Sequence, residues 1–189
     1  ATPVATGTPQ GAAGQSRSTG VKVPAAVAVY AVRCMGTWGG ARLAAKRAEI
    51  TPGDIDVCFV TDGGAEANEN AIKLARMASG RHKILARYRS YHGATAGSIT
   101  LTGDPRRWAA EPGIPGVVHV LDPYHGIERG WDTAEQSLAM LEEVIQLEGP
   151  PTIAAFILET VTGTNGILVP PDGYIQGVRE LCPRHGSLV

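Results

Sequence analysis

A glycine pair between a predicted strand and a predicted helix is the first segment that could do chemistry. Gly63 and Gly64 lie in the run 63–68 (GGAEAN), which leads into a helical pattern. The first amide groups of a helix have no acceptor within the helix, and the helix dipole adds partial positive charge there. Glycines also let a phosphate approach the backbone closely. Gly64 and Ala65 are therefore candidate anion ligands, although a tight turn without a ligand would have the same spacing.

Two further segments place polar side chains after predicted apolar strands. Tyr91, His92 and Gly93 follow the second strand, where a tyrosine ring can lie flat against a planar ligand and a histidine can form a hydrogen bond beside it. Glu159 ends the fourth strand, where an ionised group is costly unless it has a partner or a role. Spacing alone leaves open two simpler interpretations, a surface aromatic beside a capping turn and a carboxylate in water.

The elements that must position these residues alternate regularly along the chain. The pattern predicts strands over residues 56–61, 83–88, 117–121 and 153–158, and helices over residues 40–50, 65–79, 93–102, 133–148 and 173–181. Pro183 and Gly186 are expected to end the last helix, and residues 187–189 to begin another strand. This alternation predicts an α/β fold with a parallel sheet, in which ligands lie at the carboxyl ends of the strands.

Composition excludes several kinds of partner. The 189 residues include 17 Lys+Arg and 18 Asp+Glu, which give a formal net charge of -1. A nucleic-acid partner or a polybasic membrane contact would require a basic face that this balance does not supply. No apolar run reaches the roughly 18 residues that are needed to cross a bilayer. The sequence therefore predicts neither a nucleic-acid nor a membrane partner.

The composition of the first residues indicates where the folded domain begins, and the cysteines indicate its cellular compartment. Residues 1–24 are rich in small and polar residues and are expected to be disordered or loosely attached. The first twenty residues lack the pattern of a secretory signal. Cys34, Cys58 and Cys182 are widely spaced and odd in number, which favours a reducing, cytoplasmic compartment and no metal site. We expect residues 1–48 to be poorly organised and residues 49–189 to form the folded domain.

Considered together, the segments 61–73, 87–102 and 157–174 resemble class III aminotransferases, the ω-aminotransferase branch of the fold type I enzymes that use pyridoxal 5′-phosphate. The similarity begins near residue 48 and follows the order of the family. It implies that residues 49–189 form part of the cofactor-binding large domain, a partial, parallel-rich α/β/α sheet. It also implies transfer of an amino group from an amine or ω-amino acid donor to a keto acid, pyruvate or 2-oxoglutarate, by a homodimer.

The resemblance assigns a role to each candidate residue. It implies that Gly64 and Ala65 present backbone amides to the cofactor phosphate, and that Tyr91 stacks on the pyridine ring. His92 and Gly93 would shape the adjoining loop. Glu159 would support the Asp that pairs with the pyridine nitrogen. Each role suits the residue type, because a dianionic phosphate needs donors and an electron-poor ring needs a face contact.

Some features of the family pattern are missing. In the family the Asp that pairs with the pyridine nitrogen and the Schiff-base lysine lie further along, and neither has a counterpart before Val189. None of the four lysines in the sequence lies in a context like that of the family's Schiff-base lysine. They are Lys22, Lys46, Lys73 and Lys83. The resemblance therefore implies no catalytic residue in this chain, and a chain incomplete for catalysis. Asp62 brings negative charge near the phosphate ligands, and Thr164 replaces a frequent Glu, which shifts the expected acceptor toward pyruvate.

Two other interpretations stay open. One is a non-catalytic remnant that acts as a phosphate-binding or interaction module. The other is a nucleotide-binding α/β module, but neither G-x-G-x-x-G nor G-x-x-x-x-G-K-[ST] occurs at a strand-to-helix turn. The aminotransferase interpretation is preferred because it accounts for three separate segments.

Overall fold

The computed structural model describes residues 30–31, 38–53, 55–124, 130 and 134–189. In chain order the described elements are β1 (Tyr30–Ala31), α1 (Trp38–Ile50), β2 (Val60–Thr61), α2 (Gly64–Ser79), β3 (Lys83–Arg87), α3 (Ala96–Leu101), the 3-10 helix η1 (Pro105–Ala110), β4 (Val117–Val120), α5 (Ala134–Glu148), the 3-10 helix η2 (Pro150–Thr152), β5 (Ile153–Phe156) and α6 (Tyr174–Arg184). None of these helices is both long and apolar enough to span a membrane.

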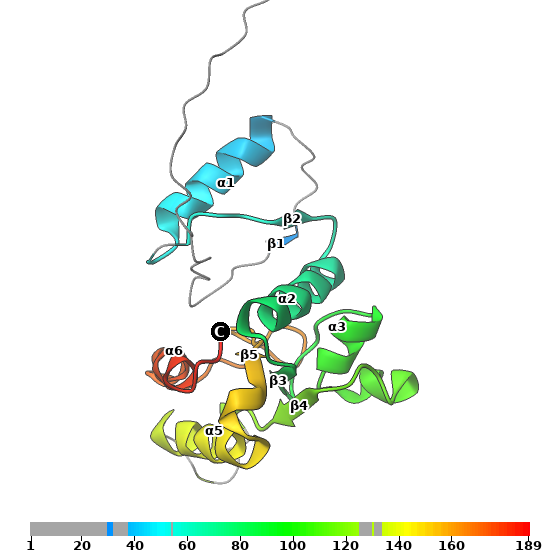
Figure 1. The fold of residues 1–189 in the computed structure, drawn as a ribbon, viewed down its shortest axis with the longest axis vertical. Helices are drawn as coiled ribbons and strands as arrows, with labels where there is room; N and C mark the ends of the chain where they lie inside the picture. Colours follow the sequence, from blue (N-terminus) through cyan, green and yellow to red (C-terminus); the bar gives the residue numbers. More distant parts are fainter. Residues whose placement is uncertain (1–29, 32–37, 54, 125–129, 131–133) are drawn as a thin grey trace, which may run out of the picture.

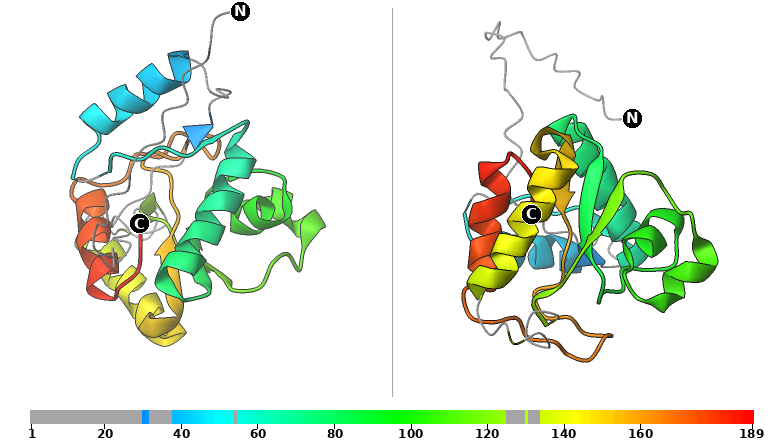
Figure 2. Two further views of the ribbon diagram at one scale, coloured as in Figure 1. Left: turned by 45° about the horizontal axis from the view of Figure 1, so that its top comes forward. Right: turned by 90° about the horizontal axis from the view of Figure 1, so that it is seen from below.

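A parallel three-stranded sheet in the order β4-β3-β5 forms the centre of the fold. Figure 1 shows α2 and α3 on one side of this sheet and α5 and α6 on the other, and both views of Figure 2 agree. Leu188 continues the sheet beyond β5, because it pairs in parallel with Ala155. The α/β fold with a parallel sheet that the sequence predicts is therefore confirmed.

Two apolar clusters hold these layers together. Leu85 of β3 faces one cluster, which includes Ile145 of α5 and Tyr174 of α6. Its neighbour Ile84 faces the other, which includes Ile72 of α2. Successive side chains of a strand point to opposite faces, so a central strand needs helices on both sides. The nearly continuous apolar run of β3 is explained by this burial on both faces.

Most predicted elements are confirmed, but several boundaries differ. The predicted strand 56–61 is wrong over most of its length, because β2 covers only Val60–Thr61 and pairs with β1 instead of the central sheet. The side chains of Val57 and Phe59, expected to be buried, are 80% and 50% exposed. The predicted helix 93–102 begins only at Ala96, because Gly93 has a φ of 134° that no α-helix accommodates.

The end of α6 also differs from the prediction. Pro183 lies inside the helix, which continues to Arg184. A proline removes one backbone donor, and in a final turn that loss affects a single hydrogen bond. The chain turns instead at Gly186, whose φ is 71°. A glycine with positive φ is a common way for a helix to end.

Candidate functional site

The start of α2 presents amide groups that the helix itself does not use. The first regular hydrogen bond of this helix runs from the amide of Ala67 to the carbonyl of Gly63, at 3.0 Å. The amides of Gly64 and Ala65 precede this bond and therefore have no acceptor within the helix. Gly63 is extended and provides no side-chain cap. The dipole of a sixteen-residue helix adds positive potential at this position.

The loop after β3 packs directly on this helix start. A Cβ atom on Gly93 would lie 2.7 Å from the Cβ of Ala65, so backbone approaches backbone here. The side-chain amide of Asn68 donates a 2.7 Å hydrogen bond to the carbonyl oxygen of His92. Two predicted groups of residues, the helix start and the histidine–glycine pair, are thus brought together. Ser98 adds a third contact, because its hydroxyl donates to the carbonyl of Ala65 at 2.8 Å.

Glu69 holds the other end of the same loop. Its Oε1 accepts hydrogen bonds from the amides of Gly97, at 2.7 Å, and Ser98, at 3.2 Å, and from the hydroxyl of Thr95, at 2.5 Å. A carboxylate of α2 therefore caps α3. Burial raises the pKa of Glu69, but the hydrogen bonds outweigh that effect and leave the pKa below its ordinary value. The loop that carries residues 91–93 is fixed to α2 along its length.

Glu159 lies three residues beyond the end of β5, not at the last strand position that the sequence suggested. Its Oε2 accepts a 3.0 Å hydrogen bond from the amide of Gly163. Its carbonyl oxygen accepts a hydrogen bond from Nη2 of Arg87, a residue that is only 2% exposed. Arg87 also donates to the hydroxyl of Thr162 at 3.1 Å. The end of β3 thereby holds the segment that carries the predicted acid.

Three buried polar atoms in this region have no hydrogen-bond partner among the described residues. They are Nε2 of His92, Nε of Arg87 and Oε1 of Glu159. Arg87 and Glu159 are joined by a hydrogen bond, and both affect the pKa of His92. Buried polar atoms are nearly always paired, and an unpaired cluster indicates a place for a polar group or water. A guanidinium donor, a carboxylate acceptor and an imidazole nitrogen together suit a planar ligand that has both donors and acceptors.

Tyr91 lies in the same loop, half-buried, with the guanidinium of Arg106 over its ring. The six predicted residues therefore come from three segments: the α2 start contacts the loop at His92 directly, and Arg87 at the end of β3 holds the segment of Glu159. Sequence reasoning missed Arg87, Asn68 and Arg106. Arg87 had a signal, since it is a charge that ends an apolar strand, as Glu159 was thought to be. Asn68 and Arg106 had none, because nothing in their spacing distinguishes them from exposed polar residues.

Histidine 92 is neutral in the folded protein over most of the pH range. Burial lowers the pKa of His92 from its ordinary value of 6.5 to about 4, while Glu159 opposes this shift and Arg87 adds to it. Between these two values the unfolded chain binds a proton that the folded chain does not. The contribution of neutral His92 to the free energy of unfolding is therefore fully present above pH 6.5, and it falls as the pH decreases toward 4.

Replacing His92 with glutamine should remove this dependence. We expect the loss of unfolding free energy between pH 7 and pH 4 to be smaller in His92→Gln than in the unmodified chain, by about 2 kcal/mol. Urea unfolding followed by circular dichroism at several pH values measures this loss of unfolding free energy. His82→Gln, which changes an exposed histidine, is the matched control and should keep the original slope. An unchanged slope in His92→Gln would contradict the buried neutral state.

Metal chemistry finds no support among the described residues. No group of three or more His, Cys, Asp and Glu side chains within the described ranges is arranged to hold a metal ion. Cys182 is fully buried, and burial raises the pKa of its thiol to about 12. A thiol in this state is a poor nucleophile and a poor ligand. The loops that converge near His92 are the better candidate site.

Comparison with known proteins identifies relatives of the whole described region. The family model "Aminotransferase class-III" matches residues 22–189. The hypotaurine/taurine–pyruvate aminotransferase of Paracoccus denitrificans is 37% identical over 172 residues, which cover 85% of this chain and 37% of that protein. An uncharacterised aminotransferase of Bacillus subtilis, YhxA, is 39% identical over 157 residues, with 78% and 34% covered. The chain thus spans about a third of the length of the curated relatives it matches.

Solved structures similar to this chain are also aminotransferases. A taurine:2-oxoglutarate aminotransferase from Bifidobacterium kashiwanohense, in complex with PLP and glutamate, is 45% identical with a TM-score of 0.63, over 67% of this chain and 30% of that one. A transaminase from the marine bacterium Virgibacillus is 36% identical with a TM-score of 0.70, over 81% of this chain and 35% of that one. These identities are high enough to concern more than the fold.

Proposed function

Because the chain belongs to the class III aminotransferases, we propose that residues 49–189 form part of the large domain that binds pyridoxal 5′-phosphate in such an enzyme. The observation that carries this proposal is the packing of the loop at His92 on the α2 start, together with the Arg87–Glu159 hydrogen bond and three buried polar atoms without partners among these residues. A site of this kind suits a ligand with both hydrogen-bond donors and acceptors.

Each predicted residue has a role in this proposal. The amides of Gly64 and Ala65 bind the phosphate, where the helix dipole favours negative charge. Tyr91 lies against the pyridine ring, and the glycine at position 93 lets the loop approach the helix closely. Glu159 and the neutral His92 provide an acceptor and a hydrogen-bonding nitrogen beside the ring. When it is bound, pyridoxal phosphate supplies the electron sink that makes amino transfer feasible.

The proposed reaction moves an amino group from an amine or ω-amino acid to a keto acid. The Paracoccus relative is described as acting on hypotaurine or taurine with pyruvate, and the Bifidobacterium structure is of an enzyme for taurine and 2-oxoglutarate. Thr164 at the place of a frequent family Glu favours pyruvate as the acceptor. A cytoplasmic location and a homodimer belong to the same proposal, as in the intact family.

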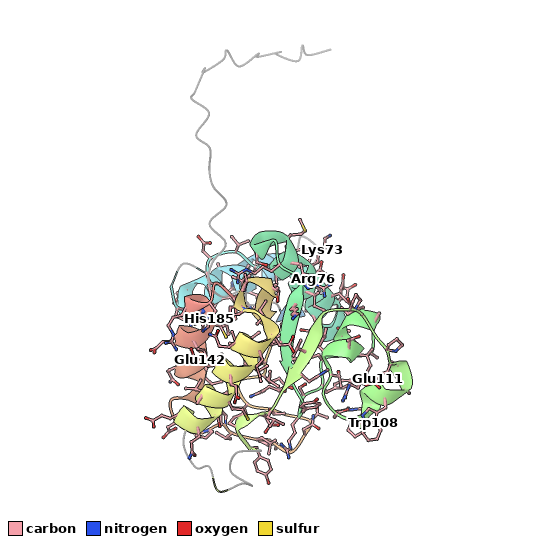
Figure 3. All side chains as sticks on the ribbon, turned by 60° about the horizontal axis from the view of Figure 1, so that its bottom comes forward. Lys73, Arg76, Trp108, Glu111, Glu142 and His185 are labelled. Atoms are coloured by element: carbon pink, nitrogen blue, oxygen red, sulfur yellow. The ribbon has the colours of Figure 1, made fainter. Side chains whose placement is uncertain are left out.

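These 189 residues alone are proposed not to catalyse the transfer, because their described lysines lie away from the site. The Nζ of Lys46 pairs with Glu49 at 2.7 Å on α1, and that of Lys83 pairs with Glu148 at 2.7 Å. Lys73 is exposed on α2, where Figure 3 labels it. Transamination needs a lysine that can reach the cofactor and carry protons. None of these three side chains is placed to do so.

Binding of pyridoxal phosphate by the 189-residue chain tests the proposal. We expect saturable quenching of the intrinsic fluorescence, with inorganic phosphate as a competitor. Gly64→Asp should abolish this binding through charge repulsion but keep the fold, because a Cβ at position 64 has nothing within 4 Å and an acid suits a helix start. Lys73→Gln on the same helix changes the net charge equally and should bind normally. Borohydride reduction should leave no single labelled lysine.

Two outcomes would overturn this proposal. Absence of saturable binding to the unmodified chain would remove the cofactor site. If Gly64→Asp bound pyridoxal phosphate as well as the unmodified chain does, the phosphate would have to bind at another place. If one lysine became stoichiometrically labelled and the chain turned over an amine, the cofactor would be confirmed, but the inactivity of this chain would be wrong.

A further inference from the structure

A guanidinium group covers one face of the ring of Tyr91. The Cζ atom of Arg106 lies 3.9 Å from the centroid of this ring. Two other arginine–tyrosine contacts occur among the described residues, and both are looser, at 5.1 Å and 5.7 Å. A cation over an aromatic face is attracted by the ring quadrupole, and this attraction weakens quickly with distance. One face of the half-buried Tyr91 ring is therefore in close contact with a cation of the protein.

Asp104 fixes the guanidinium over the ring. Both carboxylate oxygens of Asp104 accept from Nε of Arg106 at 3.0 Å, and Oδ1 also accepts the backbone amide of Arg106 at 2.9 Å. The hydrogen bonds from Arg106 hold the pKa of Asp104 below its ordinary value. Asp104 is 7% exposed, whereas the arginine side chain is 47% exposed. An exposed arginine would otherwise occupy many rotamers, so the buried acid selects one.

The same carboxylate also reaches the segment that follows the predicted acid. The side-chain amide of Asn165 donates to Oδ2 of Asp104 at 3.4 Å. Asn165 belongs to the loop whose Gly163 amide binds the carboxylate of Glu159. Asp104 thus connects the aromatic loop and the acidic loop, which are about seventy residues apart in sequence. The guanidinium of Arg106 is already paired with the carboxylate of Asp104, which argues against Arg106 as an anion-binding group.

From this arrangement we infer that Arg106, held by Asp104, is a positioning residue for Tyr91, an inference that rests on the function proposed above. The guanidinium fixes the ring plane from one side, and the opposite face takes the pyridine ring of the cofactor. A ring that is fixed before binding loses less conformational freedom when the ligand arrives, so affinity increases. Asn165 extends this order to the segment of Glu159.

A second unit of the same chemistry provides a matched control. Arg107 pairs with Glu111 at 3.0 Å and lies 5.7 Å from the ring centroid of Tyr88. Arg107 and Glu111 line a pocket of about 570 Å³, together with His119. Figure 3 labels Glu111 beside Trp108, on the side of the molecule away from α5 and α6. Arg107 also donates a 2.8 Å hydrogen bond to the carbonyl oxygen of Gly103, so changing it removes an arginine contact from the same helix without removing the cation over Tyr91.

The test compares Arg106→Met with Arg107→Met in the full 189-residue chain. Arg106→Met should raise the dissociation constant for pyridoxal phosphate about three- to tenfold, with the charge over the ring removed and its volume kept. In the absence of cofactor, hydrogen exchange should become faster at the amides of residues 91–93 and 163–168. Arg106→Lys, which keeps a cation but not the two-point contact with Asp104, should lie between. Arg107→Met, which removes a hydrogen bond to the carbonyl of Gly103, should leave the affinity unchanged and should not affect exchange at residues 163–168.

The outcomes separate this inference from the function on which it rests. Unchanged affinity and unchanged exchange in Arg106→Met would overturn the positioning role, while binding by the unmodified chain would leave the proposed function intact. Failure of the unmodified chain to bind would overturn the function, and the exchange measurement would still report whether Arg106 orders both loops. Equal effects of Arg106→Met and Arg107→Met would show a general loss of surface order and would also overturn the inference.

Discussion

Replacing Gly93 with alanine is expected to lower the free energy of unfolding by about 3 kcal/mol and to weaken pyridoxal phosphate binding. The new Cβ would lie 2.7 Å from the Cβ of Ala65 and 3.0 Å from that of Ser98. The φ of 134° at position 93 adds strain for any residue with a side chain. Because α2 and the loop must separate, the amides at the helix start would shift relative to His92.

A double-mutant cycle tests this explanation. Ala65→Gly removes the closest contact and should restore about 1 kcal/mol to Gly93→Ala, although the strained φ remains. Gly64→Ala is the control, because a Cβ there has nothing within 4 Å; its stability should change by less than about 1 kcal/mol. Urea unfolding by circular dichroism gives the energies, and fluorescence quenching gives the affinities. No coupling between positions 93 and 65 would contradict the contact.

Gly103→Ala is expected to be at least as destabilising, at about 3 kcal/mol or more, and no side-chain change should rescue it. A Cβ at this position would lie 2.1 Å from the carbonyl oxygens of both Arg87 and Tyr88. The amide of Gly103 also donates to the carbonyl oxygen of Ser90 at 3.1 Å. These neighbours are backbone atoms of the last residue of β3 and of the residue after it, and they cannot turn away as a side chain can.

Thermal and urea unfolding of Gly103→Ala measure this effect directly. The reason for the loss is a backbone displacement at the end of β3, so hydrogen exchange should become faster at residues 88–93 as well. The exposed turn at Gly53, where a Cβ meets nothing within 4 Å but φ is 77°, gives a comparison for backbone strain alone. If Gly103→Ala lost no more stability than Gly53→Ala, the close approach at position 103 would be without consequence.

The periodic elements were predictable because their signals are local. The apolar spacing of α2 and α5 and the apolar run of β3 each arise from burial against one layer or between two. The strand expected over residues 56–61 failed because apolar composition does not reveal whether a sheet lies beside it. Pro183 was expected to break a helix, but its position in the last turn reduces the cost to one hydrogen bond.

The candidate site was predictable only as separate segments. A glycine-lined helix start, an aromatic in a loop and an acid after a strand are visible in sequence; the first two segments contact each other, and Arg87 of β3 binds the third. Which side chains connect them was not predictable. Arg106 and Arg107 are adjacent and alike in sequence, yet only Arg106 lies over Tyr91. That difference depends on the turn of η1 and on a loop some sixty residues later.

The pairing of Leu188 with the outer edge of β5 has a consequence for synthesis on the ribosome. Each new parallel strand is added to one that has already been made: β4 beside β3, β5 on the other flank of β3, and Leu188 beside β5. Among the described strands of this sheet, none has to wait for a later one to be inserted between it and its neighbour. Nascent chain leaving the exit tunnel can therefore extend the sheet outward from β3, one strand-and-helix unit at a time.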